Sequence, residues 1–130
     1  MLNAIAELYR FSRMLLGLIL SGDLLQYSGV RRVALMNFEW DELKNERNTT
    51  KHGFDFNDAC RVFAFPMVVD LDARSNYGEN RWVGTGMLDG RIVVVVVVEP
   101  DEETVRIISL RKALTHEKRR YEQYIKNRLE

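Results

Sequence analysis

From residue 36 onward, the hydrophobic and polar residues first follow a helical spacing and later the pattern of strands. The first part of this region predicts two helices. Asp41 is placed to cap a helix over residues 41–51, because its carboxylate accepts hydrogen bonds from free amide groups. Gly53 then suits the left-handed end of that helix. A second helix, starting at residue 55 or 57 and ending at residue 65, is predicted from apolar side chains at helical spacing, with Pro66 after it.

Further along the chain, β-branched and apolar residues dominate and predict strands joined by short turns. Asp89-Gly90 is a strong hairpin signal, because both central positions of the turn need a positive φ. The valines at 93–98 disfavour a helix and do not alternate with polar residues, so they predict a central strand buried on both faces. The predicted strands span residues 67–71, 81–88, 91–98 and 104–110.

A last helix is predicted after these strands, capped by Thr115. Its apolar side consists of Tyr121, Tyr124, Ile125 and Leu129. The predicted fold class is therefore α+β, an antiparallel four-stranded sheet meander with two N-terminal helices and one C-terminal helix.

Residues 1–35 differ from the rest of the chain. They carry four arginines against two acidic residues, and their apolar run at 14–20 is far shorter than the ~20 residues of a membrane span. Basic residues before a short apolar run also occur in signal peptides, but no clean cleavage site follows here. We expect an amphipathic helix over 3–20 and interpret residues 1–35 as an N-terminal extension of a domain at 36–130. A membrane-surface role for that helix is the weaker alternative.

The composition is that of an ordinary globular protein and narrows the possible chemistry. Nineteen basic residues balance nineteen acidic ones, so no global positive field indicates a nucleic-acid binder. Cys60 is the only cysteine, which excludes an internal disulfide and suits a reducing cytoplasm. With His52 and His116 as the only histidines, a metal site made by the protein alone is poorly supplied, and we expect no cofactor.

Basic residues gather on the last strand and the start of the last helix. They are Arg106, Arg111, Lys112, Lys118, Arg119 and Arg120. Cations at a helix start face the positive end of its dipole, at a cost of a few tenths of a kcal/mol each, so a bound anion would explain them. The simpler interpretation is a solvated helix face paired with Glu117 and Glu122. Arg106 and Arg111 are an odd number of positions apart, which places them on opposite faces of a regular strand.

Further candidate residues lie earlier in the chain. His52, with Lys51 beside it, stands at a helix C-terminus, where the simplest role of a histidine is that of a capping cation. Glu79 and Arg81 are two residues apart at the start of a strand, so they share a face and are placed to pair. Tyr121 is most simply an aromatic residue at the edge of the core with its hydroxyl exposed.

Four stretches of the chain, in this order and spacing, resemble the BrnT family. The first is Phe38-Glu39-Trp40-Asp41-Glu42-x-Lys44-x-x-x-Asn48-x-x-Lys51-His52-Gly53. The second is Phe56-x-x-Ala59-x-x-Val62-Phe63, and the third is Glu79-x-Arg81-x-x-x-x-Gly86 before the valine strand. The last is Val105-Arg106-Ile107-Ile108-Ser109-x-Arg111-x-Ala113, followed by Glu117-x-x-x-Tyr121. The resemblance covers residues 36–122 and leaves out residues 1–35.

This resemblance implies a cytoplasmic type II toxin of the RelE-like fold, a ribonuclease that cuts RNA and stops translation. It implies neutralisation by a BrnA-type antitoxin in a hetero-oligomer, expected to be a heterotetramer, that reaches operator DNA only through the antitoxin. The family elements carried over to this chain are Lys51, His52, Glu79, Arg81, Arg106, Ser109 and Arg111.

Metal-independent RNA cleavage needs a base for the 2′-hydroxyl, an acid for the leaving 5′-oxygen and cations around the phosphorane. Guanidinium groups suit the cationic role, which we assign to Arg81, Arg106 and Arg111. His52 or Glu79 is the expected base, and Lys51 or Tyr121 the expected acid. The remaining cations, Lys112, Lys118, Arg119 and Arg120, are expected to bind RNA. The alternative is a non-catalytic module whose basic strip docks an antitoxin or nucleic acid.

Overall fold

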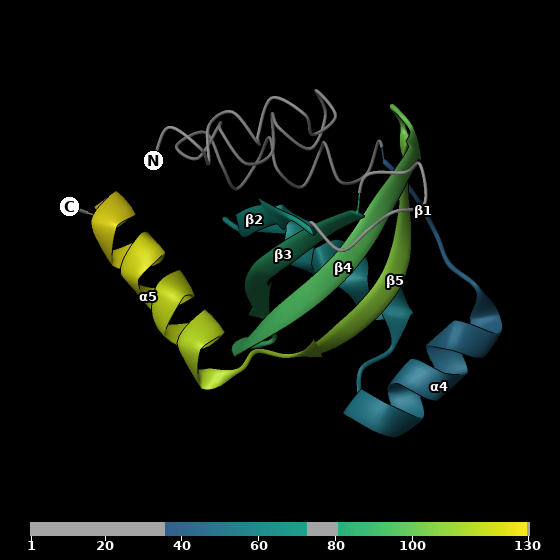
Figure 1. The fold of residues 1–130 in the computed structure, drawn as a ribbon, viewed down its shortest axis with the longest axis horizontal. Helices are drawn as coiled ribbons and strands as arrows, with labels where there is room; N and C mark the ends of the chain where they lie inside the picture. The colour runs from purple at the N-terminus through teal and green to yellow at the C-terminus, as the bar shows by residue number, and fades with distance from the viewer. Residues whose placement is uncertain (1–35, 73–80, 130) are drawn as a thin grey trace.

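The computed structural model describes residues 36–72 and 81–129. The predicted extension at 1–35, its amphipathic helix and the candidate residue Glu79 lie outside the described residues. Figure 1 shows one twisted sheet with helices around it. Within the described ranges, no helix is both long enough and apolar enough to cross a membrane.

The sheet has five strands, in the order β1-β5-β4-β3-β2. Strands β2 (Val68–Leu71), β3 (Arg81–Leu88), β4 (Arg91–Asp101) and β5 (Thr104–Lys112) form the predicted antiparallel meander. Strand β1 (Asn37–Glu39) pairs in parallel with β5, which makes the sheet mixed. The α+β class is confirmed, whereas the prediction of a purely antiparallel four-stranded sheet was wrong. The additional strand β1 has three residues, which is too short for an alternating pattern to be recognised.

Strand β4 is central, as its valines predicted. Val93 and Val94 point to opposite faces of the sheet, and both are fully buried. The β3–β4 turn is also confirmed, since Asp89 and Gly90 have φ values of 50° and 79°.

The first helix is α4 (Glu42–His52), and its two ends are the predicted ones. The Asp41 carboxylate accepts the backbone N–H of Lys44, and Gly53 has a φ of 77°. The last helix, α5, spans Thr115–Leu129, so Thr115 lies inside the helix rather than capping it.

The second predicted helix is a 3₁₀ helix, η1 (Phe56–Ala64), rather than an α-helix. Phe56, Ala59 and Val62 are all buried, and their spacing of three matches three residues per turn. This side of η1 packs on one face of the sheet. Gly86 permits the close contact, since a Cβ there would lie 2.8 Å from a methyl group of Val62.

Candidate functional site

A bulge in β5 decides which way its arginines point. Val96 of β4 is opposite Ser109, but Val97 is opposite Ile107, so Ile108 is an extra residue in β5. Arg106 pairs with Val98 and Arg111 with Val94, and these two valines share a face. The expectation that the two arginines lie on opposite faces is therefore wrong. Both lie on the face turned away from η1.

Asn48 attaches α4 to β5 and determines where His52 lies. The strand β1 covers β5 only from Thr104 to Arg106, so β5 has other partners further along. At Leu110 the Asn48 side chain donates to the backbone oxygen at 2.8 Å and accepts the N–H at 3.1 Å. This buried pair of bonds replaces a neighbouring strand. His52 follows Asn48 by about one helical turn and thus lies on the same side of α4.

His52 is partly buried near two cations. Burial, the charge of Lys51 and the charge of Arg111 each lower the pKa of His52 below its ordinary value of 6.5. The uncharged form of the imidazole is therefore favoured more than in an ordinary histidine. An uncharged imidazole can accept a proton as a general base, whereas a histidine that acts as a capping cation already carries that proton.

Arg111 is held by Glu117 from the first turn of α5. Its two terminal nitrogens donate to the two carboxylate oxygens at 2.8 and 2.9 Å. Glu117 also accepts the N–H of Leu114 at 2.8 Å, so one carboxylate fixes the arginine and caps the helix start. The pair raises the pKa of Arg111 and lowers the pKa of Glu117. Sequence reasoning treated Glu117 as a neighbour of cations and as part of a family stretch, and assigned the helix cap to Thr115 instead.

A second cationic group lies at the other end of β5. Arg81 and Arg106 flank Val98 in one row across three strands, on the same face as Arg111. Arg106 donates through Nε to Glu39 at 2.8 Å. The Nε of Arg81 is buried and has no hydrogen-bond partner in the described structure. Four positions along β4 separate this row from that of Arg111, roughly 13 Å at ~3.3 Å per residue. The guanidinium groups thus share a face but form two groups rather than one.

Tyr121 is more buried than expected, with 3% of its surface exposed. Its hydroxyl donates to the backbone oxygen of Pro66 at 2.9 Å, so the expectation of an exposed hydroxyl is wrong. Burial, with a smaller contribution from Tyr124, raises the pKa of Tyr121 to about 12.

The four cations predicted to bind RNA diverge. Arg120 donates to both carboxylate oxygens of Asp70, at 2.6 and 2.8 Å, which joins α5 to β2. Arg119 is exposed. Lys112 and Lys118 are exposed and border a groove along α5. Among the described residues, no group of three or more His, Cys, Asp and Glu side chains is placed to hold a metal ion.

The geometry thus defines a small α+β domain with three arginines on one sheet face and a histidine of lowered pKa near one of them. A family model described as the ribonuclease toxin BrnT of type II toxin–antitoxin systems matches residues 40–117 of the 130. The chain therefore belongs to this family of ribonuclease toxins.

Among solved structures, the chain is similar to the crystal structure of the Brucella abortus ribonuclease toxin BrnT. The two are 28% identical, the match covers 62% of this chain and 99% of that one, and the TM-score is 0.49. A search among curated proteins gives no match.

Proposed function

We propose that this chain is a metal-independent endoribonuclease that arrests translation and is centred on the junction of α4, β5 and α5. The junction consists of Lys51, His52, Arg111 and Glu117. The observation that carries the proposal is that Asn48 and Glu117 fix the elements that bear His52 and Arg111, close enough for the charge of Arg111 to lower the pKa of His52. Acid–base chemistry on a phosphodiester requires this combination of groups.

In the proposed reaction, His52 removes the proton from the 2′-hydroxyl, and the 2′-oxygen then attacks phosphorus. The bond from phosphorus to the 5′-oxygen breaks, and Lys51, exposed beside His52, gives a proton to that leaving oxygen. The products are a 2′,3′-cyclic phosphate and a 5′-hydroxyl. Tyr121 is the less suited acid, because its hydroxyl is bonded to Pro66. Glu79 is retained as the alternative base.

Arg111 stabilises the phosphorane in this proposal. Its nitrogens already face Glu117, so the phosphate replaces the carboxylate as their acceptor. Arg81 and Arg106, in the second row, bind a neighbouring part of the RNA rather than the same phosphate. Ser109, between the two rows, faces the same bound strand. Lys112, Lys118, Arg119 and Arg120 extend the RNA-binding surface along α5.

Cleavage of RNA by the purified chain, with and without a chelator, tests the chemistry. We expect full activity with chelator present, and loss of activity would point to a metal mechanism. Arg111→Ala is expected to lower the rate about 10²–10³-fold, the usual cost of one transition-state donor. Arg47→Ala, an exposed arginine on α4, is the matched control and should cleave normally. Equal rates for the two variants would contradict the role of Arg111.

The partner in the proposal is a BrnA-type antitoxin, which forms a heterotetramer with the toxin and binds operator DNA. Expression in a bacterium without the antitoxin should arrest growth with breakage of cytoplasmic RNA.

One observation favours a competing function, a non-catalytic binding module: Arg106, Arg111 and Arg120 are each already paired with a carboxylate. A non-catalytic binding module with such paired cations would accumulate harmlessly and leave RNA intact.

A further inference from the structure

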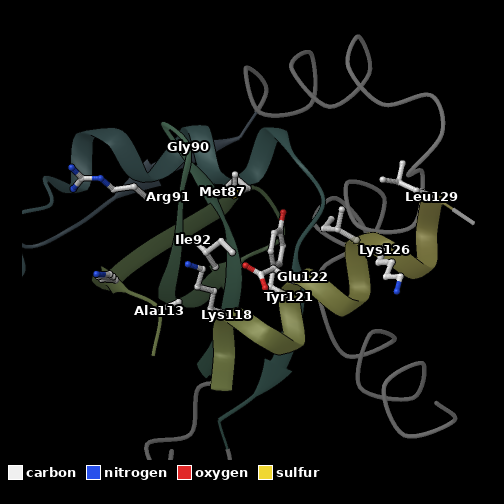
Figure 2. Close-up of a pocket in the computed structure, with 12 residues that line it drawn as sticks. Met87, Gly90, Arg91, Ile92, Ala113, Lys118, Tyr121, Glu122, Lys126 and Leu129 are labelled. Carbon is white, nitrogen blue, oxygen red and sulfur yellow. The ribbon is translucent and has the colours of Figure 1, made fainter. Parts of the chain in front are cut away.

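A groove of about 740 Å³ runs between α5 and the β3–β4 hairpin. Figure 2 shows Ile92 and Met87 beside Tyr121 at its centre, with Leu129 toward the end of α5. A second hollow shares Tyr121 and Met87 with this groove and extends it to Phe65. The floor is therefore apolar over its length.

Among the described residues, none covers this apolar side of α5. Tyr121, Ile125 and Leu129 follow each other at four-residue spacing and line the groove, yet of the α5 residues only Tyr121 is buried. Leu129 is 84% exposed, and Phe65 at the far end is 49% exposed. An exposed apolar stripe next to a hollow is typical of a protein–protein contact.

The rim of the groove is cationic. Arg91, Lys112, Lys118 and Lys126 line it against one carboxylate, that of Glu122, and all five side chains are exposed. A second copy of this chain would bring like charges together, which disfavours self-association. The ring at the centre of the groove offers RNA no face to stack on, because Tyr121 is 3% exposed.

We infer that this groove binds an amphipathic segment of the antitoxin, with apolar side chains on one side and flanking Asp or Glu residues. The inference rests on the proposed antitoxin partner. Apolar side chains fill the floor, and the carboxylates meet the four rim cations. Because Lys112 and Lys118 directly adjoin Arg111 and Glu117 in sequence, the bound segment ends beside the proposed catalytic junction. It therefore also covers two of the cations proposed to bind RNA.

Binding of the full-length chain to the antitoxin encoded beside its gene, measured by calorimetry, tests the inference. The charge-reversal variant Arg91→Glu/Lys126→Glu changes only the groove rim and should weaken binding about tenfold or more. Its control is Lys44→Glu/Arg47→Glu, two exposed cations on α4 with the same change in net charge. The control should bind the antitoxin as the unsubstituted chain does, and both variants should cleave RNA normally.

A second pair of variants, one in the groove and one control, tests the apolar floor. Leu129→Glu should weaken antitoxin binding, whereas Leu43→Glu on α4 should not, and both leucines are exposed enough to be replaced without unfolding the domain. Equal antitoxin affinity of groove and control variants would overturn the inference. So would loss of RNA cleavage by the Arg91→Glu/Lys126→Glu variant at unchanged antitoxin affinity, which would make the groove an RNA surface.

The same measurements separate this inference from the proposed function. A chain that binds the antitoxin through the groove but leaves RNA intact refutes the nuclease and supports the groove. A chain that cleaves RNA but does not bind the antitoxin refutes the partner and the groove together.

Discussion

The helices α4 and α5 lie on opposite sides of the sheet (Figure 1). Both are polar, but different kinds of side chain attach them to it. The buried residues of α4 are two asparagines, Asn45 and Asn48, whose side chains bond to backbone atoms of other segments. The buried residue of α5 is one aromatic, Tyr121, supported by ion pairs of Glu117 and Arg120. Amide side chains with several directed bonds fix a helix in one position. A helix attached at one aromatic and at its first turns keeps an apolar side available for a partner.

The largest expected effect is on the attachment of α4. Asn48→Ala leaves the buried N–H and oxygen of Leu110 without their partners, at a cost of about 2–3 kcal/mol in the free energy of unfolding. Urea unfolding measures this cost. Asn127→Ala, an exposed asparagine on α5, should lose less than ~0.5 kcal/mol. Similar losses for both variants would remove the contrast between the helices.

The attachment of α5 is expected to be weaker. Tyr121→Phe removes the hydrogen bond to Pro66 and should cost about 1 kcal/mol. Tyr124→Phe, whose hydroxyl accepts from Arg128 at the surface, is the control and should be near neutral. Cleavage by Tyr121→Phe should stay within about twofold of the unsubstituted chain, whereas a fall of ~10²–10⁴-fold would identify Tyr121 as the acid.

The Arg111–Glu117 pair should make stability depend on pH. Because the pKa of Glu117 is lowered in the folded chain, its contribution is present above the ordinary value of 4.5 and disappears as the pH falls through the folded pKa. Glu117→Gln should therefore be less stable than the unsubstituted chain at neutral pH, and the difference should shrink in acid. A difference that is constant from pH 7 to pH 3 would contradict this role.

The end of α4 should tune the pH dependence of cleavage. If neutral His52 is the base, the rate should rise with pH through an apparent pKa below 6.5. Removing one cation with Lys51→Met should move the pKa of His52 upward, toward 6.5, although the variant also loses the proposed acid and should cleave slowly. NMR titration of His52 in both proteins checks the same shift without relying on activity. An unchanged pKa would show that Lys51 does not act on His52.

The smallest expected effect is at the outer end of α5. Leu129→Gln should change the free energy of unfolding by less than ~0.5 kcal/mol, because this side chain is 84% exposed. Amide hydrogen exchange should be faster in the last turns of α5 than around Asn48 in α4. Equal protection would show that α5 is as firmly held as α4.

Much of the fold was readable from the sequence, because it depends on neighbouring residues. Asp41 and Gly53 marked the ends of α4, and Asp89-Gly90 marked the hairpin. The strand β1 was missed as a strand because its pairing with β5 depends on residues 67 positions away, as in Glu39 and Arg106. The 3₁₀ form of η1 was missed because its apolar spacing fits two kinds of helix over so short a segment.

The residues of the candidate site were proposed from the sequence, but their arrangement could not be. Lys51, His52 and Arg111 were expected together, and the charges of Lys51 and Arg111 do act on His52. Glu117 and Asn48 were missed as the residues that fix them, because a carboxylate or amide shows its partner only in three dimensions.

The sequence by itself determined the four antiparallel strands, both ends of α4, the β3–β4 turn and the family, since each depends on local backbone preference or on residue spacing. Only the tertiary structure decided that Arg106 and Arg111 share a face. One unpaired residue, Ile108, reverses the alternation of every side chain after it, and pairing with β4 rather than local preference determines where that residue falls.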